Sequence, residues 1–137
     1  MRRILIFIIL LKCFSAYAVD LDIIKNIESS GNPKAYNSTS NARGLYQITP
    51  ICLKEWNNFN PKETYTQDDL FDPAINRKIA DWYLHVRIPK MIKHYKKYLT
   101  DRNILIAYNA GISYVVSGKE LPEETKSYIQ KYIQGGK

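Results

Sequence analysis

The stretch Ile27-Glu28-Ser29-Ser30-Gly31-Asn32-Pro33 organises the chain, because it ends a short apolar helix with an acidic side chain. Ile23, Ile24 and Ile27 recur at helical spacing, and Asp20 ahead of them is of a type that caps helices. Glycine and proline then end the pattern, since neither continues a helix well. The spacing therefore predicts that Glu28 lies on the last turn of this helix, at the edge of the core.

A carboxylic acid in this position is expected to keep its proton more readily than usual. The negative end of the helix dipole and the apolar neighbours both disfavour the charged form, which raises the pKa of a carboxyl group. An acid that is protonated near neutral pH can donate a proton to a glycosidic oxygen. Taken alone, Glu28 is weak evidence, because a glutamate near a helix end is usually an ordinary solvated residue.

Two later motifs, rich in amide and aromatic side chains, are candidates to face this acid. In Gly44-Leu45-Tyr46-Gln47-Ile48-Thr49-Pro50, the glycine permits a tight turn, and Gln47 offers a donor and an acceptor to a sugar amide or hydroxyl. In Ala107-Tyr108-Asn109-Ala110-Gly111, the tyrosine ring can stack on a sugar while its hydroxyl bonds the acid, and Asn109 can fix the helix end. By itself, each motif is more typical of a loop-to-helix junction or a helix cap beside a core aromatic residue.

Helix signals dominate the rest of the chain. Thr49-Pro50 and Asp72-Pro73 each combine a capping residue with a proline suited to the first helical position. Pro89 is expected to break or kink the second of these helices, Asp101 to cap another, and Pro122 to begin the last. Residues 32–43 and 57–69 are predicted loops, and 112–116 is the best strand candidate. The predicted class is mainly α, with several helices around one core in a single domain.

The first residues follow the pattern of a secretory signal. Arg2 and Arg3 precede an apolar run at 4–11, and Ala16-Tyr17-Ala18 supplies a cleavage site of small residues. The run holds 8 residues, whereas a membrane-spanning helix needs roughly 20. The sequence therefore predicts a signal peptide at 1–18 and one domain at 19–137, exported to the periplasm or cell envelope without stable membrane insertion after cleavage. Retention of the segment as an uncleaved anchor stays open.

Cysteine content and charge limit the remaining possibilities. Cys52 is the only cysteine in 19–137, so no disulfide crosslinks this domain, and a small buried side chain is expected there. The whole chain carries +7; without Arg2, Arg3 and Lys12, its 20 basic residues fall to 17 against 13 acidic ones, a net charge of about +4. This charge favours an anionic partner, such as a wall polymer, a membrane surface or nucleic acid, without choosing among them.

In this order, the motifs resemble the lytic transglycosylase domain of the goose-lysozyme-like superfamily, often called the soluble lytic transglycosylase domain. The family pattern runs from Glu-Ser and Asn-Pro through Gly-Leu-Met-Gln and a following Pro to Ala-Tyr-Asn-Ala-Gly and Pro-x-x-Thr-x-x-Tyr. In this chain the elements stand at Glu28-Ser29, Asn32-Pro33, Gly44 to Gln47, Pro50, Ala107 to Gly111 and Pro122 to Tyr128. The resemblance covers nearly all of 19–137. It implies a lysozyme-like multi-helix domain with the active-site cleft beside the first helix.

The resemblance also implies roles for single residues. Glu28 matches the family's one catalytic acid and base, Gln47 and Tyr108 match cleft residues that bind substrate or support the acid, and Tyr128 matches a tyrosine close to the glutamate. Asn109 belongs to the same supporting set.

Two positions depart from the family pattern. Tyr46 stands where the family usually has methionine and is expected to reshape a subsite wall. The loop from Pro33 to Gly44 is one residue longer than the commonest spacing, so the family's helper serine falls on Asn37 or Ser38, of which Ser38 is preferred.

Enzymes of this family cut the β-1,4 bond between N-acetylmuramic acid and N-acetylglucosamine in peptidoglycan. They leave a 1,6-anhydromuramyl product and use no metal or cofactor. Beside Glu28 the chain shows no second carboxylate in a recognisable motif, the next acid being Glu55, whereas a two-carboxylate glycosidase needs both. We therefore expect a lytic transglycosylase. A lysozyme-type hydrolase, with a distant acid brought close by folding, stays open.

Two other classes are alternatives. A non-catalytic peptidoglycan-binding scaffold would keep the cleft, although the presence of Glu28 favours an enzyme. A nucleic-acid binder would use Lys93, Lys96 and Lys97 with their neighbouring tyrosines, but the export signal opposes it. In its size and its predicted signal peptide, the chain resembles the small stand-alone accessory enzymes of secretion, conjugation or pilus systems. We therefore expect a monomer that binds glycan strands and acts with such a machine.

Overall fold

The computed structural model describes residues 18–136, and these are mainly helical, which confirms the predicted class. The helices are α1 (Leu21–Ser29), α2 (Pro50–Phe59), α3 (Pro73–Trp82), α4 (Ile88–His94), α5 (Asp101–Asn109), α6 (Ile112–Ser117) and α7 (Glu123–Gly135). A two-stranded antiparallel hairpin joins β1 (Tyr36–Asn37) to β2 (Ala42–Arg43) inside the predicted loop 32–43. Except for Ala18, the predicted signal peptide lies outside the described residues.

Side-chain caps begin the helices that position the later motifs. The carboxylate of Asp20 accepts hydrogen bonds from the amides of Asp22 and Ile23, at 2.8 and 3.3 Å. Asp72 caps α3 in the same way, and Thr49 accepts from the amide of Cys52 at 3.3 Å to cap α2. These three caps are as the sequence predicted.

The cap of α5 was predicted one residue too late. Thr100 has an extended backbone and accepts a hydrogen bond from the amide of Asn103 at 3.1 Å, so it is the cap. Asp101 is instead the first helical residue, where its carboxylate faces the positive end of the helix dipole.

One further prediction is wrong, and another is borne out only in part. Residues 112–116 form α6 and not a strand, because the segment packs on α4 and α5, and this packing overrides its β-branched and aromatic composition. Pro89, predicted to break or kink the preceding helix, does not end the helical run, but the run is irregular directly before it. A π-helical turn, Tyr83–Arg87, joins α3 to α4, and the amide of Ile88 bonds the carbonyl of Tyr83. This wider turn accommodates a residue that lacks the amide needed to continue the usual ladder.

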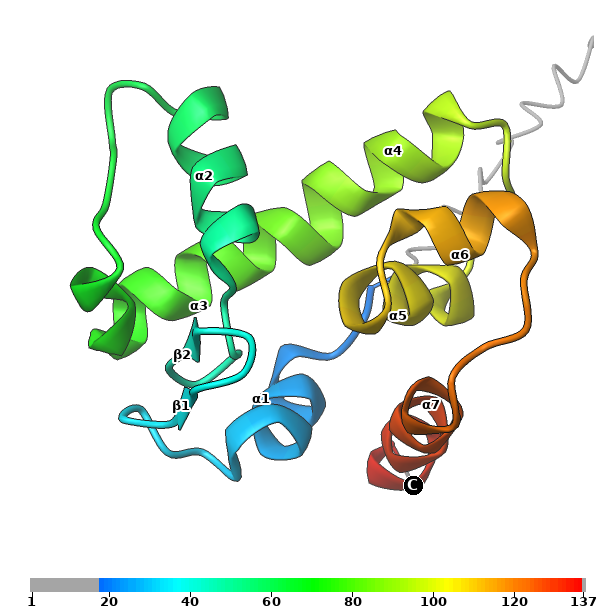
Figure 1. The fold of residues 1–137 in the computed structure, drawn as a ribbon, viewed down its shortest axis with the longest axis horizontal. Helices are drawn as coiled ribbons and strands as arrows, with labels where there is room; N and C mark the ends of the chain where they lie inside the picture. Colours follow the sequence, from blue (N-terminus) through cyan, green and yellow to red (C-terminus); the bar gives the residue numbers. More distant parts are fainter. Residues whose placement is uncertain (1–17, 137) are drawn as a thin grey trace, which may run out of the picture.

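The continuous helical run from α3 to α4 crosses the molecule, and α1, the hairpin and α7 lie on one side of it (Figure 1). α7 packs against both α1 and α5, and α5 packs against α4 and α6. Leu84, Ile88 and Ile92 are completely buried along the long run and pack with the apolar faces of the other helices. This packing brings the first and last helices together, although about 100 residues separate them.

Candidate functional site

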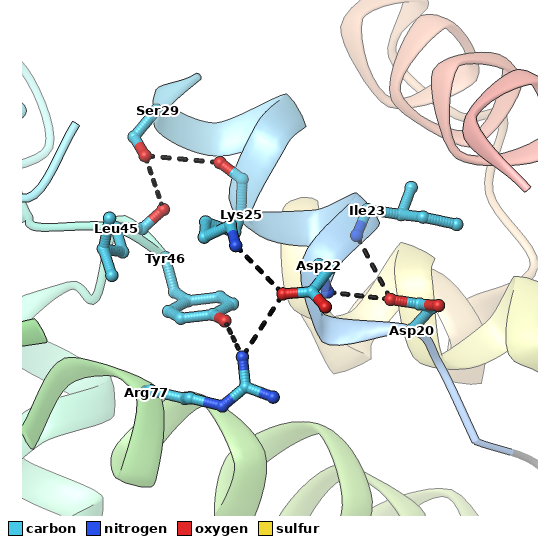
Figure 2. Close-up of polar contacts among 8 residues, drawn as sticks. All are labelled: Asp20, Asp22, Ile23, Lys25, Ser29, Leu45, Tyr46 and Arg77. Carbon is cyan, nitrogen blue, oxygen red and sulfur yellow. Dashed lines mark hydrogen bonds and ion pairs between the residues drawn. The ribbon is translucent and has the colours of Figure 1, made fainter. Parts of the chain in front are cut away.

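α1 is held against the rest of the molecule at both of its ends. Near its start, one guanidinium nitrogen of Arg77 on α3 donates to the carboxylate of Asp22, at 3.4 Å, and to the hydroxyl of Tyr46, at 2.9 Å (Figure 2). At its end, the hydroxyl of Ser29 donates to the carbonyl of Leu45 at 2.8 Å. Glu28 lies between these anchors, directly before Ser29, so they fix the position of the helical turn that carries it.

Glu28 is partly buried and lies against α7. The hydroxyl of Tyr128 donates a hydrogen bond to Glu28 Oε1 at 2.8 Å. Burial raises the pKa of the Glu28 carboxyl to about 7; the bond from Tyr128 opposes this rise, and the negative charge of Glu124 adds to it. Glu28 is thus a carboxylic acid that exchanges its proton near neutral pH, which is the property that general acid catalysis requires.

The turn between β2 and α2 is built around a buried asparagine. The Asn76 side chain, wholly buried on α3, accepts from the amide of Tyr46 and donates to the carbonyls of Arg43 and Leu70, each at 2.8 Å. Gly44 has a φ of +77°, and a Cβ there would collide with Asn76 and with the Leu70 carbonyl. Only glycine fits this close approach, so the turn and α3 are locked together.

Gln47 and Tyr46 point to different places from this turn. Gln47 has a φ of +48°, and its amide nitrogen donates to the carbonyls of Gly44 and Ala35, at 3.0 and 3.3 Å. These bonds hold the side chain at the cavity wall. The Tyr46 ring is completely buried and reaches Arg77, so the structure does not place it in a subsite wall as the sequence predicted. A tyrosine is long enough to cross the core and place its hydroxyl on Arg77, so it contributes to the site only through its backbone.

Tyr108 and Asn109, at the end of α5, form another part of the wall. The sequence suggested that the Tyr108 hydroxyl bonds the acid, but it donates to the carbonyl of Tyr46 at 2.6 Å. The tyrosine that bonds the acid is Tyr128. The side-chain oxygen of Asn109 accepts from the hydroxyl of the buried Thr125 at 2.7 Å, which ties α5 to α7. Both residues therefore hold neighbouring elements in place while facing the same space.

That space is a cavity of about 450 Å³. Its lining comprises Ile27, Glu28, Asn37, Ser40, Ala42, Gln47, Ile48, Thr49, Cys52, Tyr83, Tyr108, Asn109, Glu124, Ser127, Tyr128 and Lys131. The structure thus brings together Glu28, Gln47, Tyr108, Asn109 and Tyr128 of the predicted set. Ser38 is exposed outside the lining, whereas Asn37 and Ser40 border the cavity. The side chain of Asn37 accepts hydrogen bonds from the amides of residues 39 and 40, which fixes the turn that contains Ser38.

On the α7 side of the cavity, sequence reasoning identified only Tyr128. Glu124, Ser127 and Lys131 line it beside Tyr128, and their spacing of three and four residues places all four on one face of α7. This periodicity is visible in the sequence once a helix is predicted there. The buried Asn76, among apolar positions of a predicted helix, is a similar signal, because a polar side chain inside a core must be fully hydrogen-bonded.

Among residues 18–136, none of the helices combines the length and apolar character needed to cross a membrane. Nor do the described residues gather three or more His, Cys, Asp or Glu side chains that could hold a metal ion. Burial raises the pKa of the Cys52 thiol far above its ordinary value, so this lining residue is not a reactive thiolate.

The comparison with known families agrees with this geometry. The model of the transglycosylase SLT domain matches residues 15–130, which is most of the chain. No curated protein sequence matches the chain. The match covers the acid on α1, the Gly44 turn, the end of α5 and the tyrosine on α7. The chain therefore belongs to the transglycosylase SLT domain family, whose activity is the lytic cleavage of peptidoglycan.

Proposed function

We propose that the cavity is the active site of a lytic transglycosylase that cuts the β-1,4 bond between N-acetylmuramic acid and N-acetylglucosamine, with Glu28 as its single general acid and base. The observation that carries this proposal is the state of Glu28. It is partly buried, hydrogen-bonded by Tyr128 at 2.8 Å, faces a cavity and has its pKa raised to about 7. A carboxyl group poised in this way can give and take a proton in one reaction cycle.

In the first step, protonated Glu28 donates its proton to the glycosidic oxygen as the bond from that oxygen to C1 of the muramyl residue breaks. The positive charge that develops at C1 is stabilised by the substrate's own 2-acetamido group. In the second step, the Glu28 carboxylate takes the proton of the 6-hydroxyl while that oxygen bonds to C1. The product is a 1,6-anhydro ring, no water is consumed, and Glu28 returns to its protonated form.

Tyr128 and Gln47 have supporting roles in this scheme. A hydroxyl that donates to Glu28 stabilises the carboxylate between the two steps and fixes which oxygen faces the substrate. The amide nitrogen of Gln47 is used within the protein, which leaves its side-chain oxygen to accept a hydrogen bond from a sugar amide or hydroxyl.

Hydrolysis is the second candidate function, and one observation favours it. Glu124 lines the same cavity as Glu28 and is close enough for its charge to raise the pKa of Glu28. A second carboxylate can activate water in a two-carboxylate glycosidase. Glu124 is exposed in the first turn of α7, however, so it lacks the buried setting of Glu28.

The deciding experiment incubates purified peptidoglycan with the wild-type protein, Glu28→Gln and Glu124→Gln, and identifies the soluble products by mass spectrometry. Transglycosylation predicts anhydromuramyl ends, lighter by one water than hydrolytic ends, from the wild type and Glu124→Gln but not from Glu28→Gln. Reducing muramyl ends that disappear in Glu124→Gln would establish the hydrolase instead. Binding to peptidoglycan without any product from the wild type would favour the scaffold.

We also propose that the protein is exported to the cell envelope and acts there as a monomer, opening the wall locally for a secretion, conjugation or pilus machine. The basic and apolar pattern of residues 2–11 and the Ala16-Tyr17-Ala18 site support export. Fractionation of cells that express the full chain, with N-terminal sequencing of the exported protein, tests it. Cleavage after Ala18 is the expected result, and retention of the whole chain in the cytoplasm would contradict it.

A further inference from the structure

α7 presents a mixed polar face to the cavity. Glu124, Ser127, Tyr128 and Lys131 all line it, and Tyr128 within this face bonds the acid. Because α7 packs on both α1 and α5, this face has a fixed position relative to Glu28. Any group attached to a sugar at Glu28 therefore meets the side chains that flank Tyr128.

The flanking side chains carry opposite charges. Apart from Glu28, whose proton is exchangeable, Glu124 and Lys131 are the acidic and basic residues of the lining. They are seven positions apart, which is about 10.5 Å along a helix. Within residues 18–136 neither forms an ion pair, whereas Lys126, on another face of α7, pairs with Glu123 at 2.7 Å and Glu120 at 3.3 Å.

The glycan backbone of peptidoglycan is uncharged, so the sugars offer these two side chains hydrogen bonds but no group of opposite charge. The charged groups of the polymer are on the short peptide stem attached to the lactyl group of each muramic acid, and a stem carries free carboxylates. Glu124 lies close enough to Glu28 to raise its pKa, and it would repel a carboxylate at that end of the face. A carboxylate near the cavity is therefore driven along α7 toward the ammonium group of Lys131.

We propose that Lys131 is a specificity-determining residue that binds a carboxylate of the peptide stem, so that the enzyme acts preferentially on stem-bearing glycan. This inference rests on the proposed function, since it concerns the substrate of the same cavity. It assigns the two ends of the α7 face different tasks: Glu124 repels the stem carboxylate, and Lys131 binds it two helical turns along the face from Glu124.

The test compares two substrates: glycan strands with intact stems, and the same strands after an amidase has removed the stems. The quantity measured is the ratio of kcat/KM on the first substrate to kcat/KM on the second, for wild type, Lys131→Gln and Lys126→Gln. The ratio should fall about three- to tenfold in Lys131→Gln, the effect of losing one charge-assisted bond at a partly solvated site. The change should appear in KM. Lys126→Gln removes a charge from the same helix outside the cavity and should keep the wild-type ratio.

Binding provides a readout that does not depend on catalysis. In a Glu28→Gln background, calorimetry with soluble stem-bearing muramyl fragments should show weaker binding when Lys131→Gln is added, and the salt dependence of binding should decrease. A wild-type ratio near one, or an equal loss on both substrates in Lys131→Gln, would overturn the inference. If no strand is cut but Lys131-dependent binding of stems persists, stem recognition stands and the proposed catalytic function fails.

Discussion

Glu28 derives its chemistry from its surroundings, since an exposed glutamate would be ionised at pH 7. Burial is the largest influence on its pKa, and the hydrogen bond from Tyr128 limits the rise. The pKa of Glu28 therefore reflects a balance between burial, which raises it, and the hydrogen bond from Tyr128, which lowers it. Both effects can be removed separately, which makes the proposed role testable at the level of one residue.

Cleavage should depend on pH through the protonated form of Glu28. With a pKa of about 7, kcat/KM should fall about tenfold per pH unit at higher pH, because only the protonated acid begins the reaction. Tyr128→Phe removes a bond that favours the carboxylate, so the pKa of Glu28 should rise. The pH–rate profile of this variant should show a lower maximum with its basic limb shifted to higher pH; a shift to lower pH would contradict the assignment.

The same residue should make stability depend on pH. Between the unfolded pKa of about 4.5 and the folded pKa of about 7, the native state binds more protons than the unfolded state, so the free energy of unfolding falls as pH rises. The loss is at most about 3 kcal/mol. Glu28→Gln abolishes it, so this variant should gain stability relative to wild type as the pH rises through that range. Urea unfolding at pH 4.5 and pH 8 measures the difference, and a constant difference would be the contrary result.

Among the elements, the turn that carries Gly44 depends most on close packing. The side chain of Asn76 hydrogen-bonds three backbone groups, namely one amide and two carbonyls, and Gly44 lies directly against it. The same turn carries the Tyr46 carbonyl, which accepts the hydrogen bond that positions Tyr108. A disturbance at this point would reach both the Gln47 and the Tyr108 sides of the cavity.

Gly44→Ala should destabilise the protein by about 3 kcal/mol or more, since it combines left-handed strain with a collision. Gly31→Ala is a matched control, because Gly31 has a φ of +78°, against +77° for Gly44, but nothing within contact distance of a new Cβ. It should lose only about 1–2 kcal/mol. Chemical denaturation of both variants measures this; equal losses would show that close packing adds nothing at Gly44.

For the molecule as a whole, the decisive event is the docking of α7 on α1 and α5, since it brings Tyr128 to Glu28. The hydrogen bond from the buried Thr125 to the partly exposed Asn109 is one contact that holds this arrangement. Its loss would leave the amide oxygen of Asn109 without its protein donor and loosen one wall of the cavity.

Thr125→Val should therefore lower stability by about 1–2 kcal/mol, or about 4–8 °C in Tm, and reduce cleavage activity as well. Thr64→Val, at an exposed position, is a control for the loss of a hydroxyl and should change Tm little. Thermal unfolding followed by circular dichroism measures both. A fall in activity without any change in Tm would instead mean that Thr125 acts through the site alone.

The sequence alone determined the mainly helical class, three of the helix caps and the position of the candidate acid, because these depend on local signals. Asp20, Thr49 and Asp72 cap through bonds to residues two or three positions away, so neighbouring residues are sufficient to predict them. The ordered motifs likewise indicated the family, which the match over residues 15–130 shows. Glu28, Gln47, Tyr108, Asn109 and Tyr128 were all named from these motifs and all border one cavity.

Only the tertiary structure decided which contacts each of those residues makes. Which tyrosine bonds the acid depends on the docking of α7, and the burial of Tyr46 depends on the distance across the core to Arg77. Residues 112–116 became helical through packing on α4 and α5, which their composition does not encode. The side chains of Glu124 and Lys131 line the cavity because α7 packs beside α1, which the sequence did not show. Contacts between distant segments depend on the packing free energy of the whole core, and a local sequence pattern does not determine that free energy.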